Sequence, residues 1–300
     1  MKTRYVECAI TFALLSTACG GAEQQDAMDG METIVVENVG FATPESVYHD
    51  TAADVYLVSN INGSPLEVDD NGFISRVAPS GEVVELKWID GASEAVTLNA
   101  PKGMTMSGNI LYVADLTVVR MFDRETGAPM GEIAVEGSSF LNDLATGPNG
   151  TVYLTDTGFQ GGEQGFVPSG TDAVYRIENG EAVAIAEGDA LGRPNGVVVA
   201  GEAVWVVTFG SGALYQVQEM APVNQMSLPE GSLDGVVMLD DGDLLISSWD
   251  AQAVYRGPVG GPFEVVVRDV PAPADIGYDA QRGRVLIPLF QDNAVRIVPL

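Results

Sequence analysis

One strand-turn-strand pattern recurs along most of this sequence. Each copy starts at a Pro, Leu or Ala, continues through an apolar strand and a turn containing Gly or Asp, and ends in a second strand rich in Val, Leu, Tyr and Trp. The six copies begin at Pro44, Pro101, Leu141, Pro194, Leu233 and Ala274. Their starts are 39 to 57 residues apart, which is close to the length of one four-stranded propeller blade.

Six copies predict an all-β fold, a six-bladed β-propeller. Further strands are expected from Ala173, Ala213, Ala253 and Ala294, so each unit continues past its second strand, and the last copy stops at its third. The segment 33–38, TIVVEN, can supply the outermost strand of the sixth blade and close the ring. Two turn-rich insertions, from Ile61 and from Gly158, are expected to be loops on one rim.

The N-terminal segment predicts export. Two basic residues precede an apolar run over 6–15 that is too short to span a bilayer, and Ser, Thr and Ala precede Cys19. This layout resembles a bacterial lipoprotein signal, which implies a signal peptide over 1–18 and a lipid on Cys19. A plain signal peptide with a chance cysteine is the alternative. We expect a tether over 19–32, the propeller over 33–300, and a periplasmic or outer-membrane lipoprotein held to the membrane through its lipid only.

Composition excludes several classes of function. With 14 basic and 42 acidic residues the formal charge is −28, which disfavours nucleic acids and anionic lipid surfaces as partners. Cys8 and Cys19 are the only cysteines, and His49 is the only histidine. Disulfides, thiolate sites and multi-histidine metal sites are therefore not expected in the propeller. We expect His49 to be an exposed turn residue.

Polar residues occupy equivalent positions at the starts of the repeats. In a propeller the first strand of each blade lines the central channel, so the residue after each start should face one axial pocket. These residues are Glu45, Lys102, Asn142, Asn195, Asp234 and Asp275. Four of them, Glu45, Asn142, Asn195 and Asp234, offer the hard oxygen atoms that Ca²⁺ prefers, and another divalent cation is possible. Alternatively, Asn195-Gly196 and Asp234-Gly235 are simple turns.

Four short motifs resemble those of the SMP-30/gluconolactonase family of lactonases, including the luciferin-regenerating enzymes. They are PES from Pro44, LND from Leu141, RPNG from Arg193 and LDG from Leu233, within a resemblance that covers residues 39–300. The resemblance implies that Glu45, Asn195 and Asp234 are calcium ligands, and that Asn142 completes the site or faces the substrate.

The resemblance also implies an activity, the calcium-dependent hydrolysis of a lactone or related ester. Asp234 is the candidate base for the attacking water, and Lys102, Phe140 and Asn142 are candidate substrate-binding residues. Family members commonly carry Arg where this chain has Phe140, so a more apolar lactone or ester fits better than a sugar lactone. Lys102 either replaces the missing cation or neutralises the carboxylates when no metal is bound.

A second class of function stays open: a non-catalytic propeller that binds a ligand or protein partner, with calcium structural or absent. A lyase or quinoprotein is disfavoured because such sites generally use histidines. Asp115, Asp156 and Asp250 end second strands, where they either cap turns or ring the channel mouth. Trp205 and Trp249 are expected to pack between blades.

Overall fold

The structure is a computed structural model that describes residues 32–163 and 165–300. Residues Thr33–Leu300 form one compact unit. The signal peptide expected over 1–18 and the lipid anchor at Cys19 lie outside the described residues. Within the described part of the chain, no helix is long and apolar enough to cross a membrane.

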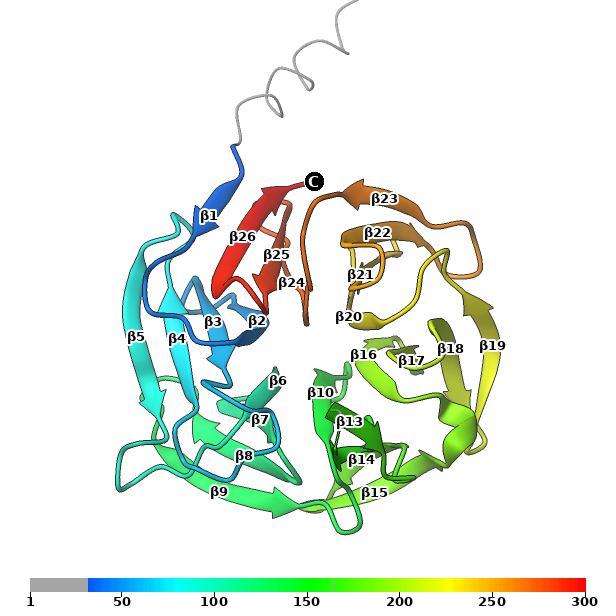
Figure 1. The fold of residues 1–300 in the computed structure, drawn as a ribbon, viewed down its shortest axis with the longest axis horizontal. Coiled ribbons are helices and arrows are strands. Elements are labelled where there is room, and N and C mark those ends of the chain that lie inside the picture. Colours follow the sequence, from blue (N-terminus) through cyan, green and yellow to red (C-terminus); the bar gives the residue numbers. More distant parts are fainter. Residues whose placement is uncertain (1–31, 164) are drawn as a thin grey trace, which may run out of the picture. The chain divides into compact units, whose positions relative to one another are not determined.

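In the described residues, six four-stranded antiparallel sheets are arranged in a ring with their first strands innermost, which confirms the six-bladed β-propeller (Figure 1). Blade 1 contains β2 (Pro44–Asp50), β3 (Val55–Asn60), β4 (Phe73–Val77) and β5 (Val83–Asp90). Blade 2 contains β6 (Pro101–Ser107), β7 (Ile110–Asp115), β8 (Val118–Asp123) and β9 (Pro129–Ala134). Blade 3 contains β10 (Leu141–Thr146), β11 (Val152–Asp156), β14 (Ala173–Glu178) and β15 (Glu181–Glu187).

The other three blades repeat this order. Blade 4 contains β16 (Pro194–Ala200), β17 (Ala203–Thr208), β18 (Ala213–Gln218) and β19 (Ala221–Ser227). Blade 5 contains β20 (Leu233–Met238), β21 (Asp243–Ser248), β22 (Ala253–Pro258) and β23 (Glu264–Val267). Blade 6 contains β24 (Gly277–Asp279), β25 (Arg284–Leu289), β26 (Ala294–Pro299) and β1 (Ile34–Val36).

Pairing of the two ends of the propeller closes the ring, as the sequence predicts. Strand β1 lies antiparallel to β26, with Ile34 opposite Ile297 and Val36 opposite Val295. Val36 is buried among hydrophobic residues of blades 1 and 6. Pairing with β1 satisfies the backbone N–H and C=O groups on the outer edge of β26, which would otherwise be exposed and unpaired.

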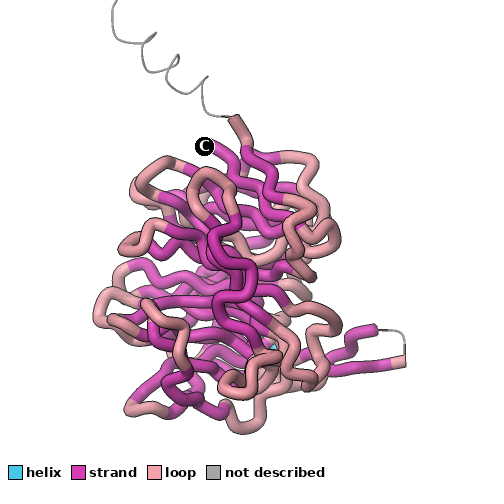
Figure 2. The backbone as a smooth tube through the Cα atoms, turned by 90° about the vertical axis from the view of Figure 1, so that its left-hand side faces the viewer, coloured by secondary structure: helices cyan, strands magenta, loops and turns pink. Residues whose placement is uncertain are grey.

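The insertion from Gly158 differs from expectation because it is not only loop. Residues Phe159–Gly162 and Gly165–Pro168 form β12 and β13, an antiparallel hairpin. Figure 2 shows this hairpin standing out from the ring. The other insertion, from Ile61, contains no strand before β4. The helical content of the described residues is a single 3₁₀ turn over Asp189–Leu191.

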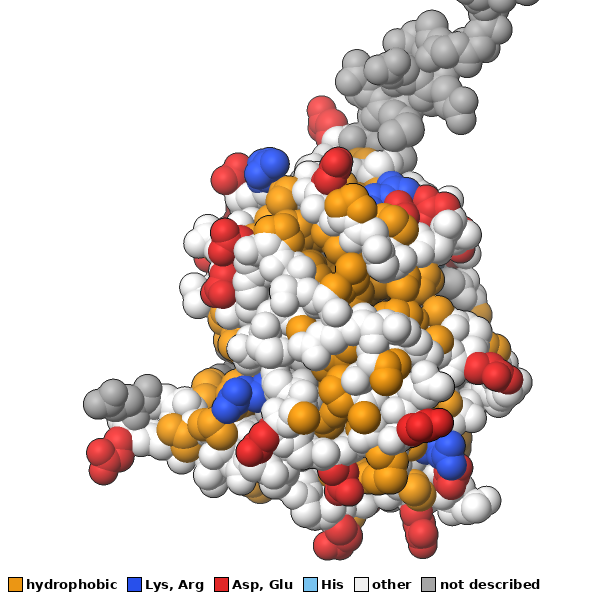
Figure 3. Space-filling view, turned by 90° about the vertical axis from the view of Figure 1, so that its right-hand side faces the viewer, with side chains coloured by type: hydrophobic (Ala, Val, Ile, Leu, Met, Phe, Trp, Pro, Cys, Tyr) orange, Lys and Arg blue, Asp and Glu red, His pale blue; other side chains and the backbone are white. Residues whose placement is uncertain are grey.

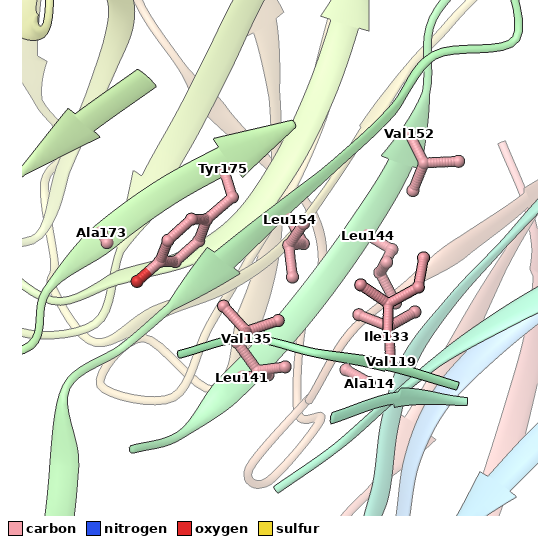
Figure 4. Packing of buried hydrophobic residues seen from close by; sticks show 10 residues of the cluster. All are labelled: Ala114, Val119, Ile133, Val135, Leu141, Leu144, Val152, Leu154, Ala173 and Tyr175. Carbon is pink, nitrogen blue, oxygen red and sulfur yellow. The ribbon is translucent and has the colours of Figure 1, made fainter. Parts of the chain in front are cut away.

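The hydrophobic core lies between neighbouring blades. Figure 4 shows one such layer, in which Val119 and Ile133 of blade 2 pack against Leu144, Val152 and Leu154 of blade 3. Alternating side chains of each strand fill the two faces of its sheet, so every blade shares a core with both neighbours. Trp205 is buried in the layer between blades 4 and 5, as predicted. Acidic side chains are spread over the surface in Figure 3, with few basic ones.

Candidate functional site

A repeated irregularity at the start of the inner strands positions the axial side chains. The register with the second strand shifts between Pro44 and Ser46 in blade 1, and shifts of the same kind occur in blades 2 to 5. The predicted axial residue lies within the shift in each of these five blades. A bulge in a strand redirects a side chain, which accounts for one polar residue per blade facing the channel.

Glycine follows the axial residue in three blades because the inner strands approach one another there. A Cβ on Gly103 would lie 2.4 Å from Asp143 Oδ1, and one on Gly196 would lie 2.4 Å from the Asp234 carbonyl oxygen. A Cβ on Gly235 would lie 2.3 Å from the Ile276 nitrogen. Asn195-Gly196 and Asp234-Gly235 therefore belong to inner strands, and the alternative interpretation of these pairs as simple turns is wrong.

Hydroxyl groups of the second strands stabilise these shifts. Asp143 N–H donates to Thr155 Oγ1 at 3.1 Å, and Thr155 Oγ1 donates to the Asn195 carbonyl of the next blade at 2.5 Å. Ser247 forms the equivalent pair, accepting from Gly235 N–H and donating to the Ala274 carbonyl, both at 2.8 Å. Each hydroxyl satisfies backbone groups freed by the bulge and joins two blades.

The structure brings the predicted site residues together around one cavity of about 470 Å³. Its lining includes Glu45, Lys102, Phe140, Asn142, Asn195 and Asp234. We call Glu45, Asn142, Asn195 and Asp234 the floor residues. They come from blades 1, 3, 4 and 5, and each is at most 5% exposed.

Each floor residue has one buried oxygen without a hydrogen-bond partner among the described residues. These atoms are Glu45 Oε2, Asn142 Oδ1, Asn195 Oδ1 and Asp234 Oδ1. A buried polar group left without a partner costs about 1–3 kcal/mol, so four of them beside one cavity require an explanation. They have the chemistry of an oxygen-rich site for a hard cation.

Neighbouring groups orient two of these oxygens. Asn142 Nδ2 donates to Thr157 Oγ1 at 2.9 Å, and that hydroxyl donates to the Pro194 carbonyl. The amide of Asn142 is thereby anchored through its nitrogen. Trp249 Nε1 donates to Asp234 Oδ2 at 2.7 Å, which occupies one carboxylate oxygen and leaves the other unpartnered.

Burial makes the ionised carboxylates of the floor unfavourable. It raises the pKa of Glu45 well above its usual value, and Asp234 and Asp275 raise it further, while Lys102 opposes the shift. Burial and Asp275 raise the pKa of Asp234, and the Trp249 hydrogen bond opposes that shift. A divalent cation would favour the ionised forms of both groups.

Two more buried carboxyl groups lie near the floor residues and line a separate cavity of about 360 Å³. Burial raises the pKa of Asp143, whose carboxylate accepts hydrogen bonds from Val197 N–H and Leu144 N–H. Burial also raises the pKa of Asp275 to about 7, although Ser46 Oγ donates to it at 2.5 Å. Both carboxyls are thus hydrogen-bonded, unlike the free oxygens of the floor.

Lys102 is a buried cation in the wall of the site. It is 1% exposed, its Nζ donates to the Ala100 carbonyl at 3.2 Å, and Nζ lies 4.3 Å from the centre of the Phe140 ring. Burial lowers its pKa, whereas Glu45, Asp115 and Asp156 raise it. The ammonium therefore interacts electrostatically with Glu45 of the floor and packs against an aromatic face that favours a cation.

Six aromatic side chains, which we call the aromatic collar, line the same cavity: Phe140, Phe159, Phe166, Phe209, Trp249 and Phe290. Trp249 was expected to pack between blades, and this prediction is wrong. Its ring contacts Phe209 and Phe290 in the collar, and its nitrogen contacts Asp234. A signal was present in the sequence, because Ile61, Phe209, Trp249 and Phe290 each directly follow a second strand.

The remaining polar candidates are structural. Asp156 accepts hydrogen bonds from the backbone N–H groups of Ser139, Phe140 and Gly158, so it caps the segment that enters β10. Asp115 caps the equivalent segment of blade 2. Asp250 is exposed and accepts from Ser232 Oγ.

His49 is not an exposed turn residue as predicted. It lies in β2, is 6% exposed and packs edge-on against Tyr56. Its ring nitrogens lie 3.4 Å from Asp54 and 3.6 Å from Asp279. Strand β2 continues through Asp50, so His49 is buried within the inner strand, and the turn that Asp50 suggested begins at Thr51.

The floor residues fit a calcium-type cation by their donor atoms. They provide two carboxylates and two amide oxygens, all hard ligands, and leave room for substrate and water in a six- to eight-coordinate shell. Among residues 32–163 and 165–300, no group of three or more His, Cys, Asp or Glu side chains is arranged to hold a metal ion. The fit therefore depends on Asn142 and Asn195 as much as on the acids.

Comparison with solved structures confirms the fold. A gluconolactonase from Xanthomonas campestris is 17% identical, with a TM-score of 0.67 over 89% of each chain. A luciferin-regenerating enzyme is 13% identical, with a TM-score of 0.65 over 90% of this chain and 96% of that one. A virginiamycin B lyase from Staphylococcus aureus is 13% identical, with a TM-score of 0.62 over 90% and 99%.

The first two neighbours are consistent with the resemblance drawn from the sequence motifs. At these identities the similarity shows the fold alone. The same fold is also found in a lyase, so it does not by itself indicate an activity. No protein-family model matches the chain, and no curated protein matches it.

Proposed function

We propose that this propeller is a calcium-dependent hydrolase of a lactone or related ester. The observation that carries the proposal is the set of four buried, unpartnered oxygens on Glu45, Asn142, Asn195 and Asp234, which line one cavity. Ca²⁺ bound there would supply a Lewis acid for the substrate carbonyl and the developing oxyanion. The gluconolactonase among the structural neighbours makes a lactone the first substrate class to test.

The side chains have distinct roles in this proposal. Glu45, Asn142 and Asn195 hold the cation through the oxygens that lack protein partners. Asp234 uses Oδ1 for the cation or for the attacking water, while the Trp249 N–H holds Oδ2. Thr157 keeps the amide of Asn142 oriented through its nitrogen.

Hydrolysis needs one proton acceptor and one proton donor. The water oxygen bonds to the carbonyl carbon, Asp234 accepts a proton from that water, and the ring oxygen leaves as the acyl C–O bond breaks. Asp234 then returns this proton to the leaving oxygen, so that one water is added overall and Asp234 is ionised again. Because cation and proton compete for the Asp234 carboxylate, activity should fall at acidic pH.

A binding protein without turnover is the second candidate. The collar and the buried Lys102 favour it, because they form a largely apolar cavity that already contains one cation. A lyase is less favoured: a histidine-to-alanine variant of the staphylococcal enzyme is described as catalytically inactive, whereas His49 lines the separate cavity and not the floor.

The test measures calcium binding and lactone hydrolysis in the same samples. Wild type should bind Ca²⁺ and hydrolyse a lactone, and chelator or Asp234→Asn should remove both properties. Asp250→Asn is the matched control, because Asp250 belongs to the same blade but is exposed. Calcium binding without hydrolysis across a broad panel would favour the binding protein, and absence of both would contradict the metal site.

We further propose that Cys19 carries a lipid at the cell envelope. The proposal depends on the small residues before Cys19 and on the apolar run over 6–15. Labelled palmitate should enter the wild-type protein and not Cys19→Ser, and unlabelled wild type would contradict it.

A further inference from the structure

The collar is a continuous arc of aromatic contacts above the floor residues. Ring centres are 5.7 Å apart for Phe166 and Phe140, 5.8 Å for Phe140 and Phe159, and 6.2 Å for Phe159 and Phe209. The arc continues from Phe209 to Trp249 at 5.6 Å and from Trp249 to Phe290 at 5.3 Å. It therefore extends from blade 3 to blade 6, and every pair lies within the range of favourable ring packing.

The two insertions meet at this cavity. Ile61 and Pro65 of the first insertion line it together with the hairpin residues Phe159 and Phe166. A Cβ on Gly161 of the hairpin would lie 3.6 Å from Leu66 Cδ1 of the first insertion. The insertions of blades 1 and 3 therefore lie next to each other, past the intervening blade 2.

The enclosing walls offer almost no hydrogen bonds to a ligand. Trp249 Nε1 is the only polar side-chain group of the collar, and it is already bonded to Asp234. Besides the floor residues, Lys102 is the other polar side chain of the lining, and one of its three N–H donors is bonded to the Ala100 carbonyl. A polyhydroxylated ligand would leave hydroxyls without partners, at about 1–3 kcal/mol each when buried.

We propose that the substrate is an uncharged lactone or ester with a hydrocarbon substituent, and that the aromatic collar binds this substituent. The proposal rests on the proposed function for the identity of the reacting group, but the preference for a hydrocarbon comes from the collar alone. Since about 150 Å³ holds one benzene ring, the cavity of about 470 Å³ accommodates a lactone ring and a substituent of similar size. Phe209, which contacts Phe159 on one side and Trp249 on the other within the arc, is the specificity-determining residue.

Three lactones with the same six-membered ring test the proposal. δ-Valerolactone has the bare ring, δ-decalactone adds a pentyl chain, and D-glucono-δ-lactone adds hydroxyl groups. With calcium present, kcat/KM should be at least about tenfold higher for δ-decalactone than for δ-valerolactone. It should be lowest for D-glucono-δ-lactone, and equal or higher rates for this sugar lactone would overturn the proposal.

Variants of Phe209 connect the preference to the collar. In Phe209→Ala the ratio of kcat/KM for δ-decalactone over δ-valerolactone should fall severalfold, and Phe209→Leu should restore most of it. An unchanged ratio in Phe209→Ala would overturn the assignment. Unfolding curves of both variants verify that the fold is intact.

A binding readout separates this proposal from the proposed function. The lactam analogue of δ-decalactone, which resists hydrolysis, should quench the fluorescence of Trp249, and its Kd should rise severalfold in Phe209→Ala. If the analogue binds in a Phe209-dependent way but no lactone is hydrolysed, the role of the collar in binding is supported and the proposed hydrolase activity is contradicted. If lactones are hydrolysed without a preference for a hydrocarbon substituent, only the proposed role of the collar is contradicted.

Discussion

The indole Nε1 of Trp249 donates a 2.7 Å hydrogen bond to Asp234 Oδ2, and this bond connects the aromatic collar to the floor residues. The same indole packs against Phe209 and Phe290. One side chain therefore serves both halves of the cavity: its ring forms apolar wall, and its N–H orients the candidate base.

Trp249→Phe should keep the ring packing and remove this hydrogen bond. Because the Trp249 bond lowers the pKa of Asp234, losing it should raise that pKa and shift the acidic limb of calcium binding to higher pH. Loss of an orienting partner typically costs 10- to 100-fold in metal affinity or activity. The pH profile measured by calcium titration is the readout, with Trp205→Phe as the control. An unshifted profile would show that the bond has no part in tuning Asp234.

Lys102→Met should tighten calcium binding by about tenfold, because it removes a buried positive charge that interacts with Glu45. Calorimetric titration with Ca²⁺ measures the change. Lys87→Met is the control, since Lys87 is exposed and pairs with Asp90. Unaltered calcium affinity with a raised KM would instead assign Lys102 to the substrate, the other role left open by the sequence.

In the metal-free protein, the buried carboxyl of Asp275 should make the free energy of unfolding depend on pH. Burial raises the pKa of this carboxyl to about 7, so the folded chain binds more protons than the unfolded chain between about pH 4 and pH 7. Its contribution to stability is full below about pH 4 and is lost as pH rises through 7, by up to about 4 kcal/mol.

Urea unfolding in chelator at several pH values measures this effect. Wild type should lose stability relative to Asp275→Asn as the pH rises over this window, because only wild type must ionise the buried group. The comparison cancels carboxyl groups that do not interact with Asp275, such as Asp50, whose pKa is lowered by hydrogen bonds from Arg124 and backbone N–H groups against the effect of burial. Glu45 and Asp234, whose pKa values Asp275 raises, add to the difference in the same direction. A constant difference between the two proteins would contradict the raised pKa.

Asp156→Ala should lower the free energy of unfolding by about 3 kcal/mol, because three backbone N–H groups lose a buried acceptor. Asp250→Ala, at an exposed position two residues after the second strand of blade 5, should change it by less than about 1 kcal/mol. Urea denaturation of both variants is the measurement. Equal effects would mean that burial of Asp156 does not matter to the cap.

Local sequence and repeat length were sufficient to predict the blades, the closing strand and five of the six axial positions; Asp275, expected at the sixth, lines the separate cavity instead. The 39- to 57-residue spacing determines the number of blades, since each unit can bury its sheet faces only against its neighbours. TIVVEN over 33–38 was assignable because the last copy lacks a fourth strand. The axial position of Glu45, Asn142, Asn195 and Asp234 followed from the same periodicity.

Tertiary structure decided what those residues contact. Trp249 and Phe290 are far apart in sequence from Phe140, and only ring closure brings their side chains to one cavity. The burial of His49 and the hairpin formed by β12 and β13 also depend on packing, which a turn-like sequence pattern does not record. Periodicity therefore determined which backbone positions face the axis, whereas long-range packing determined which oxygens stay unpartnered and which rings surround them.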